Sequence, residues 1–350
     1  MIRFKRDRFS ALLLLVLIAS SIASCAYRDT PIIEKERFLI GTIVEIKVPL
    51  PPGSSAKEIG SSIDRAFDEI SRIEGVFSVY KSDSEVSKIN RLKKDESVKI
   101  SDETFGLIEK SIRYSAITDG AFDITVKPLI DIWAKARSDG KLPSADDIRS
   151  TRERVGSRYI LLDRSAGTIA FKKDGMAIDL GGVAKGYATD RAIMILKEIG
   201  VKDAIVNSGG DLYCLGKRSA KKPWVVGIRH PRNKERMFLE LQLGDKAVDT
   251  SGDYEKYFTI EGRRYSHIID PATGYPVGDD VVSASVIADD STTADILATA
   301  LCVLGTEGMK IIDTGKGEDA VVVVKKDGAI TSVATAGLMR RYNAKENEKL

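Results

Sequence analysis

A carboxylate and a hydroxyl stand four residues apart in a stretch whose apolar spacing predicts a helix. Asp295 and Thr299 belong to the segment from Ala294 to Ala300, and residues four apart share one face of a helix. Their oxygens could hold a hard cation such as Mg²⁺, which takes protein oxygens together with substrate phosphates. The alternative is structural: an aspartate favoured by the helix dipole, and a threonine that bonds back to a backbone carbonyl.

One of the chain's two histidines lies close to a carboxylate and ahead of a Pro/Gly turn. His267 opens the run His-Ile-Ile-Asp-Pro-Ala-Thr-Gly, which ends at Gly274. A histidine side chain titrates near neutral pH, so His267 could act as a base on a substrate proton within reach. The other histidine, His230, precedes a proline without such neighbours and is expected at the surface.

Two glycine pairs follow predicted strands. In residues 179–187, Asp-Leu-Gly-Gly-Val-Ala-Lys-Gly-Tyr, the pair precedes a predicted helix. The first amides of that helix could receive a phosphate, with the Lys185 ammonium beside it. In residues 207–211, Asn-Ser-Gly-Gly-Asp, glycine could let a ligand or another backbone approach closely. The structural alternatives are a tight strand-to-helix turn with a solvated lysine, and a hairpin turn in which Asn and Asp are turn formers.

The elements that must position these residues alternate along the chain. Periodic apolar residues predict helices over residues 56–77, 102–118, 183–199 and 292–304. Strands are expected over residues 38–48, 159–171 paired with 176–180, 203–207, 224–228, 237–243, 246–250, 257–260, 282–287 and 320–324. No repeat or clear interdomain linker interrupts them, which indicates a single α+β domain of mixed sheets and helices.

The amino terminus is typical of a targeting segment. Basic residues from Arg3 to Arg8 precede an apolar run over residues 11–19, which is too short to span a bilayer. We therefore expect residues 1–24 to be a cleaved signal peptide. The last residues, Ile-Ala-Ser-Cys25, resemble the bacterial lipobox, which implies a lipidated Cys25, a tether over residues 25–36, and anchoring on the extracytoplasmic (periplasmic) face of a bacterial membrane. An ordinary signal peptide with an incidental cysteine is the alternative.

Charge and cysteine usage narrow the function classes. Of the 350 residues, the first 24 carry a net charge of +3, and the remainder holds 50 basic and 50 acidic residues. A neutral body speaks against nucleic acid as a partner, because that affinity needs clustered positive charge. Cys214 and Cys302 lie in apolar stretches and are expected to be buried free thiols. The cysteine spacing argues against a zinc site.

Taken in order, these and other segments resemble the ApbE family, FAD:protein FMN transferases of which many are bacterial lipoproteins. The resemblance rests on residues 40–42, 80–85, 120–125, 179–187, 207–211, 250–254, 266–274 and 294–299. It covers about residues 36–335 and implies a T-fold-like α+β core. The implied organisation is a single ApbE-like domain over residues 37–340, followed by a polar tail over 341–350.

The resemblance also implies roles for individual residues. Asp295 and Thr299 match the family's metal ligands, joined by the Gly182 carbonyl, with Ala184 as the alternative, and the implied metal is Mg²⁺. His267 matches the histidine implicated in catalysis. The residues that match FAD contacts are Ile40, Tyr80, Ala121, Phe122, Asp123, Asp179, Lys185 and Ile269. The family often has Met where this chain has Ile40.

The implied reaction moves FMN from FAD to a threonine or serine hydroxyl of an acceptor protein, such as a subunit of a membrane redox complex, and releases AMP. Two alternatives stay open. If water replaces the hydroxyl, the chain is an FAD pyrophosphatase that yields FMN and AMP. A non-catalytic FAD-binding lipoprotein is disfavoured, because Asp295, Thr299 and His267 are all present.

Overall fold

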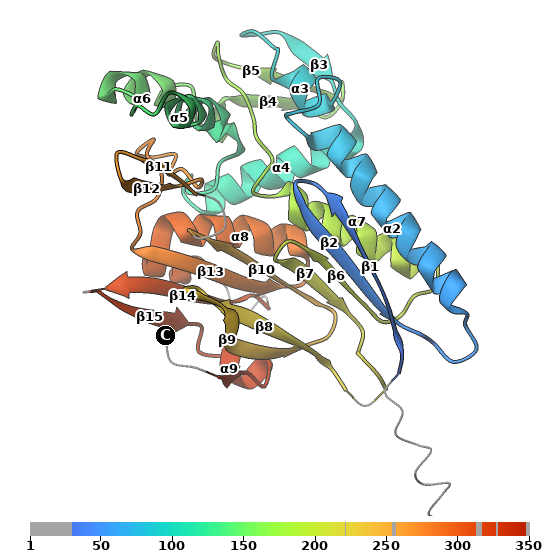
Figure 1. Cartoon of the computed structure of the whole chain (residues 1–350). Coiled ribbons are helices and arrows are strands. Elements are labelled where there is room, and N and C mark those ends of the chain that lie inside the picture. Colours follow the sequence, from blue (N-terminus) through green and yellow to red (C-terminus); the bar gives the residue numbers. More distant parts are fainter. Residues whose placement is uncertain (1–29, 221, 254–256, 313–316, 327, 348–350) are drawn as a thin grey trace, which may run out of the picture.

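An eight-stranded antiparallel sheet forms the centre of the protein (Figure 1). The computed structural model describes residues 30–347 except 221, 254–256, 313–316 and 327. In spatial order the strands are β1 (Ile32–Leu39), β2 (Thr42–Pro49), β6 (Ala204–Ser208), β7 (Asp211–Leu215), β10 (Lys246–Gly252), β13 (Val281–Ala288), β14 (Asp319–Lys326) and β15 (Ala329–Ala334). The single α+β domain expected from the sequence is confirmed.

Three helices cover one face of this sheet: α2 (Ala56–Phe77), α7 (Ala184–Glu198) and α8 (Ser291–Leu304). Helix α2 begins at a capping box, in which the Ser55 side chain and the Glu58 side chain each accept the other residue's amide. Its apolar stripe packs into the main core together with alternate residues of β2, such as Val44 and Ile46. These helices confirm three of the predicted ones almost to the residue.

A smaller antiparallel sheet covers the other face. It consists of β8 (Trp224–His230), β9 (Asn233–Leu243) and β16 (Lys345–Glu346), with α9 (Leu338–Arg341) beside it. Apolar side chains of the two sheets, including Trp224 and Leu241 against Cys214 and Val248, form a second core. Tyr342 is buried in this core, and β16 pairs with β9. The expected polar tail over residues 341–350 is therefore in part folded onto the domain.

The remaining elements form two groups, which are drawn above helix α8 in Figure 1. A three-stranded sheet of β3 (Ser97–Lys99), β5 (Thr168–Phe171) and β4 (Ile160–Asp163) lies with α3 (Glu85–Ile89) and α4 (Asp102–Ile117). Helices α5 (Lys127–Asp139) and α6 (Ala145–Arg152) pack with the hairpin β11 (Tyr257–Ile260)–β12 (Arg263–Ser266) around Trp133. Short 3₁₀ turns occur at Ile124–Val126, Ser157–Tyr159 and Gly305–Ile311.

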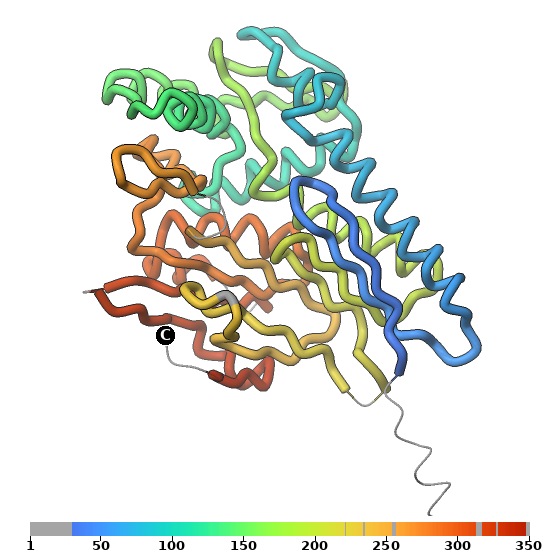
Figure 2. Tube along the Cα trace, in the orientation of Figure 1, coloured from blue at the N-terminus to red at the C-terminus, as the bar shows by residue number. Residues whose placement is uncertain are grey.

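The single strand expected over residues 38–48 is wrong, because the chain reverses there. Ile40 and Gly41 have φ of 47° and 75° and form the turn between β1 and β2. A two-residue turn with positive φ at both positions suits the twist of a hairpin. Strand β1 also begins at Ile32, inside the expected tether over residues 25–36. In Figure 2, β1 begins at the end of the hairpin opposite to the β1–β2 turn.

The expected pairing of 159–171 with 176–180 is also wrong. Strands β4 and β5, both inside the first range, pair with each other. Residues 176–180 bury Met176 and Ile178 without joining a sheet. The Asn90 side chain accepts the Ile178 amide at 2.7 Å and donates to its carbonyl at 2.9 Å, which replaces a strand partner.

Two further expectations are confirmed. Cys214 and Cys302 are both buried, and neither is in a disulfide. Residues 209–210 turn the chain between β6 and β7, as the hairpin interpretation of that glycine pair predicts. Among the described residues, no helix is both long and apolar enough to cross a membrane.

Candidate functional site

Helix α8 places Asp295 and Thr299 at the centre of the candidate site. Both side chains are on one helix face, and Asp295 is buried. The Asp295 carboxylate accepts the Gly186 amide at 3.1 Å, and the Thr299 hydroxyl lies 3.5 Å from the Ser251 hydroxyl. The start of α8 is held by Asp190 of α7, whose carboxylate accepts two amides of its first turn. Burial raises the pKa of Asp190 to about 6.

Glycines of residues 179–187 allow close packing of this segment on α8. A Cβ at Gly186 would lie 2.3 Å from the Ser291 carbonyl oxygen and 2.9 Å from the Asp295 Cβ, so only glycine permits the contact. A Cβ at Gly182 would lie 3.3 Å from the Thr299 Oγ1 and 3.4 Å from the Phe122 ring. The turn therefore lies directly against the face of α8 that carries Asp295 and Thr299.

Most amides of that turn are used within the protein. Asp179 accepts the Gly181 amide at 2.7 Å, and the Leu180 carbonyl accepts those of Val183 and Ala184 at 3.0 and 2.7 Å. The Gly186 amide is bonded to the Asp295 carboxylate, as described above. These four amides do not form the phosphate-binding row that the glycine pair suggested. The part of the turn that lies beside Thr299 of α8 is the Gly182 backbone.

Three buried carboxylates and one ammonium form the electrostatic centre of the site. Lys185 forms an ion pair with Asp211 and lies 3.5 Å from an Asp295 oxygen, so it is not the solvated lysine of the structural alternative. Asp249 is fully buried and accepts the Leu212 amide and the Ser291 hydroxyl. Burial, followed by the charges of Asp211 and Asp295, raises the pKa of Asp249 well above its ordinary value.

Asp249 is a residue that the sequence analysis did not select. The available signal was a carboxylate at an inward position of a predicted buried strand, between Val248 and Thr250. A buried carboxylate without an ammonium of its own is costly unless it is hydrogen-bonded or protonated. Its two hydrogen-bond donors and its raised pKa are both consistent with that cost.

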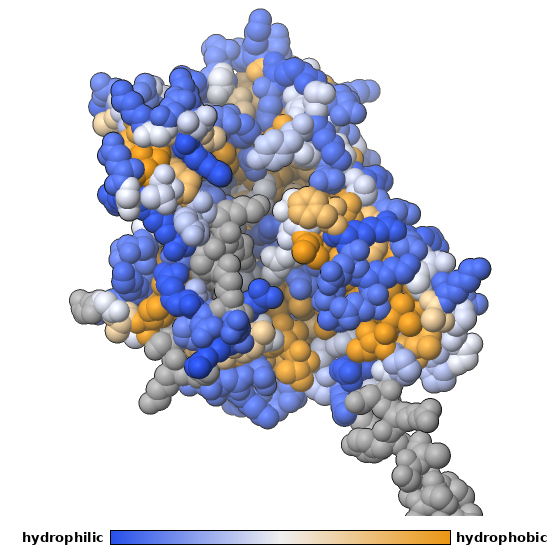
Figure 3. Space-filling view, in the orientation of Figure 1, coloured by the Kyte–Doolittle hydropathy of each residue, from blue (hydrophilic) through white to orange (hydrophobic). Residues whose placement is uncertain are grey.

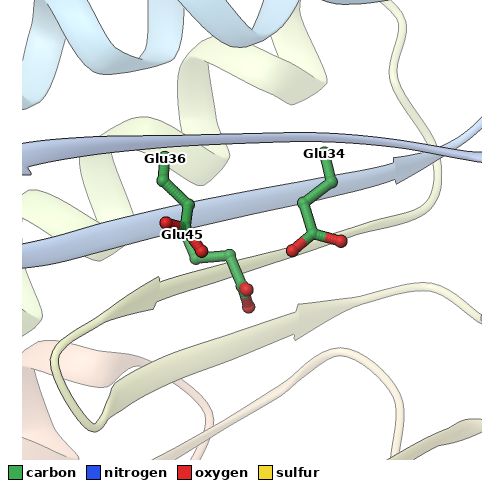
Figure 4. A group of neighbouring side chains, drawn as sticks. All are labelled: Glu34, Glu36 and Glu45. Atoms are coloured by element: carbon green, nitrogen blue, oxygen red, sulfur yellow. The ribbon is translucent and has the colours of Figure 1, made fainter.

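The donor set at α8 suits a hard divalent cation. It consists of oxygens: the Asp295 carboxylate, the Thr299 hydroxyl and the adjacent Gly182 backbone, with Ser251 next to Thr299. Oxygen ligands of this kind are those of Mg²⁺. Elsewhere in the described residues, the group of acidic side chains close enough to share an ion consists of Glu34, Glu36 and Glu45 on the β1–β2 hairpin (Figure 4).

The residues matched to FAD contacts lie in several segments. Phe122 is buried against Gly182. Asp123 accepts the amides of Thr125 and Ser157, both at 2.8 Å, so its carboxylate also holds the surrounding loop together. Ala121 and Ile269 are buried. Ile40 is in the β1–β2 turn, and Tyr80 follows α2 with 94% of its surface exposed.

His267 directly follows β12, and its side chain is exposed. The turn after it is fixed from the α5–α6 side, where Trp133 donates to the Gly274 carbonyl at 2.9 Å and Arg152 to the Ala272 carbonyl at 2.8 Å. The other histidine, His230, is half-buried rather than fully at the surface, and its Nδ1 accepts the Arg232 amide at 3.2 Å.

The structure thus joins part of the predicted site by direct contacts. Phe122 and Thr299 both lie next to Gly182, and Gly186 and Lys185 contact Asp295. His267, Ile40 and Tyr80 lie on separate hairpins and loops, outside this set of contacts. Figure 1 shows the β1–β2 turn and the β11–β12 hairpin at the side of the central sheet that faces α4 and α5.

Comparisons with known proteins agree with this architecture. The model of the ApbE family matches residues 40–323. An FAD:protein FMN transferase of Vibrio cholerae is 33% identical over 295 residues, covering 83% of this chain and 86% of that protein. An FAD:protein FMN transferase of Klebsiella pneumoniae is 33% identical over 270 residues, covering 77% and 84%.

Solved structures give the same result. The ApbE protein of Thermotoga maritima superposes with a TM-score of 0.77 at 36% identity, covering 86% of this chain and 96% of that one. The flavin transferase ApbE of Vibrio cholerae superposes with a TM-score of 0.78 at 30% identity, covering 89% and 99%.

Proposed function

This chain belongs to the ApbE family, and on that basis we propose that it is an FAD:protein FMN transferase. The observation that carries the proposal is the group of oxygens at Asp295, which is buried, Thr299 and Gly182, beside the Lys185 ammonium, in a fold shared with flavin transferases. Such a centre suits a substrate whose reacting group is a pyrophosphate.

The proposed reaction replaces the phosphoanhydride bond between the FMN and AMP phosphates with an ester bond from the FMN phosphate to the acceptor. A threonine or serine hydroxyl oxygen of the acceptor bonds to the FMN phosphorus, and the bond from that phosphorus to the bridging oxygen breaks. AMP leaves with that oxygen, and the hydroxyl proton passes to His267 or a nearby carboxylate. The products are AMP and a protein with phosphoester-linked FMN.

The residues of the centre have two roles toward the pyrophosphate, metal binding and charge neutralisation. Asp295, Thr299 and the Gly182 carbonyl, with Ala184 as the alternative, would hold Mg²⁺. When bound there, Mg²⁺ supplies Lewis-acid stabilisation of the pyrophosphate oxygens. Lys185 contributes a second positive charge at the same carboxylate.

FAD binding is proposed for residues around this centre. The exposed Tyr80 ring can stack on an aromatic ligand. Further contacts are proposed for Ile40, Ala121, Phe122, Asp123, Asp179, Lys185 and Ile269. The acceptor is a flavoprotein subunit, for example of a membrane redox complex.

Incubation of the mature protein with FAD and Mg²⁺, with and without an acceptor domain, separates the candidate functions. We expect a flavin-fluorescent acceptor band in a denaturing gel and release of AMP, both lost when EDTA removes the metal. Free FMN in equal amounts with and without acceptor would identify an FAD pyrophosphatase instead. Unchanged FAD would leave only a flavin-binding lipoprotein.

We further propose that the protein is lipid-anchored through Cys25 on the extracytoplasmic face of the membrane. The support is the basic segment, the apolar run and Ile-Ala-Ser-Cys25, all of which lie outside the described residues. Two acyl chains or more anchor a protein stably, since each buried methylene contributes ~0.8 kcal/mol.

We expect Cys25→Ala to move the protein out of the membrane fraction or to block its processing, because the thiol proposed to receive the lipid is removed. Fractionation and the intact mass of the mature protein measure this. Cys214→Ala is the matched control and should leave the membrane fraction unchanged. Unaltered membrane retention and mass in Cys25→Ala would remove the anchor from the proposal.

A further inference from the structure

One face of the β1–β2 hairpin carries an apolar pair beside an acidic group. Phe38 and Ile43 are directly paired across the hairpin, and 75% and 58% of their surfaces are exposed. The next pair on the same face is Glu36 with Glu45. The Glu34 side chain follows, and Figure 4 shows the three carboxylates coming from the two neighbouring strands.

We propose that this face, formed by Phe38, Ile43, Glu34, Glu36 and Glu45, is the docking surface for the acceptor protein. The matching surface of the acceptor would present an apolar side chain flanked by lysine or arginine. The inference rests on the proposed function, since a transferase whose second substrate is a protein must hold that protein next to its reacting centre.

The fold does not require these side chains on this face. Side chains alternate between the two faces of a strand, so α2 packs on the β1 and β2 side chains of the opposite face. Val44 and Ile46 of that face are buried in the core, and Lys35 bonds to Asp64 of α2 at 2.7 Å. The exposed phenylalanine and isoleucine therefore contribute nothing to the packing of α2.

The docking surface is continuous with the candidate site. Phe38 and Ile43 are each two or three positions from the turn at Ile40, which matches an FAD contact. At Gly209, a Cβ would lie 2.2 Å from the Thr42 side-chain oxygen, so this turn packs directly on the β6–β7 turn. That second turn leads into Asp211, the ion-pair partner of Lys185. Figure 3 shows apolar surface at this hairpin.

The negative charge of the surface indicates a partner with basic side chains. Three carboxylates share it with Lys47, which lies 3.0 Å from Glu45 and 3.3 Å from Glu34. The carboxylates are therefore only partly neutralised, and a basic partner would complete the neutralisation.

An exposed aromatic and a β-branched side chain beside charges are typical of a protein contact. Buried apolar surface contributes roughly 25 cal/mol per Å², and interface energy is concentrated in a few such anchors. The carboxylates around them would act mainly on the association rate and on partner selection. We therefore expect the apolar pair and the acidic group to have separable effects.

The test compares two variants with the wild type on one purified acceptor domain that the wild-type enzyme flavinylates. Phe38→Ser/Ile43→Thr should raise the acceptor KM about tenfold, as expected for loss of a small apolar anchor. Glu36→Lys/Glu45→Lys should also raise the acceptor KM, and the wild-type rate at low acceptor concentration should fall with added salt. FAD affinity, from flavin fluorescence, and kcat at saturating acceptor should stay near the wild-type values in both.

Val333→Thr is the matched control, because Val333 is an exposed β-branched residue on β15, the opposite edge of the same sheet. Its acceptor KM should equal that of the wild type. An unchanged acceptor KM in both hairpin variants would overturn the docking surface while leaving the transferase function intact. A wild-type enzyme that consumes FAD but labels no acceptor would instead overturn the proposed function.

Discussion

Asp295→Asn should lower FMN transfer by about a thousandfold while leaving the fold intact. Asparagine keeps the size of the side chain and can still accept the Gly186 amide, which lies 3.1 Å from the aspartate oxygen. What it removes is the negative charge that would hold the divalent cation. Loss of a metal ligand costs several kcal/mol of transition-state stabilisation, and each 1.36 kcal/mol corresponds to about tenfold in rate.

The readouts are turnover as a function of Mg²⁺ concentration and the melting temperature of the same preparations. Asp295→Ala should be equally inactive but less stable, because the Gly186 amide then loses its acceptor. Asp289→Asn is the control: this exposed carboxylate pairs with Lys246 just before α8 and should be nearly neutral. Mg²⁺-dependent turnover near the wild-type rate in Asp295→Asn would contradict the metal assignment.

Turnover should fall by about 10²- to 10⁴-fold in His267→Ala, the range that a positioned general base contributes. FAD affinity should change far less, because the α8 centre and Tyr80 are untouched.

The competing interpretation is that His267 packs under the flavin or ties down the following turn. Trp133 and Arg152 already bond to the Gly274 and Ala272 carbonyls, so that turn has other restraints. His230→Ala is the matched control, since His230 is the only other histidine of the chain. Weaker FAD binding with little loss of rate at saturating FAD would remove His267 from the catalytic residues.

The sequence pattern predicted an element correctly where the interactions that form it lie within one segment of the chain. Helix α2 follows from the spacing of its apolar residues and from the Ser55 cap, all within one segment. The β1–β2 turn lacks such a signal. Its first position is Ile40, a β-branched residue that rarely adopts positive φ, so residues 38–48 resemble one continuous strand. Only pairing with the neighbouring strand reveals the reversal.

The candidate site divides along the same line. The sequence by itself determined the family, the helix that presents Asp295 and Thr299 together, and the glycines that precede α7. Tertiary structure alone decided that Lys185 joins Asp211 to Asp295 and that Asp249 lies unexposed beside them.

The physical reason is that the energy of a charge or an amide depends on its neighbours in space. Asp211, Asp249 and Asp295 come from β7, β10 and α8, and nothing in the spacing of these segments states that they converge. Burial, and after it the nearby charges of Asp211 and Asp295, raises the pKa of Asp249 well above its ordinary value. A residue's type and local element can be read along the chain, whereas the partner that satisfies it is supplied by the fold.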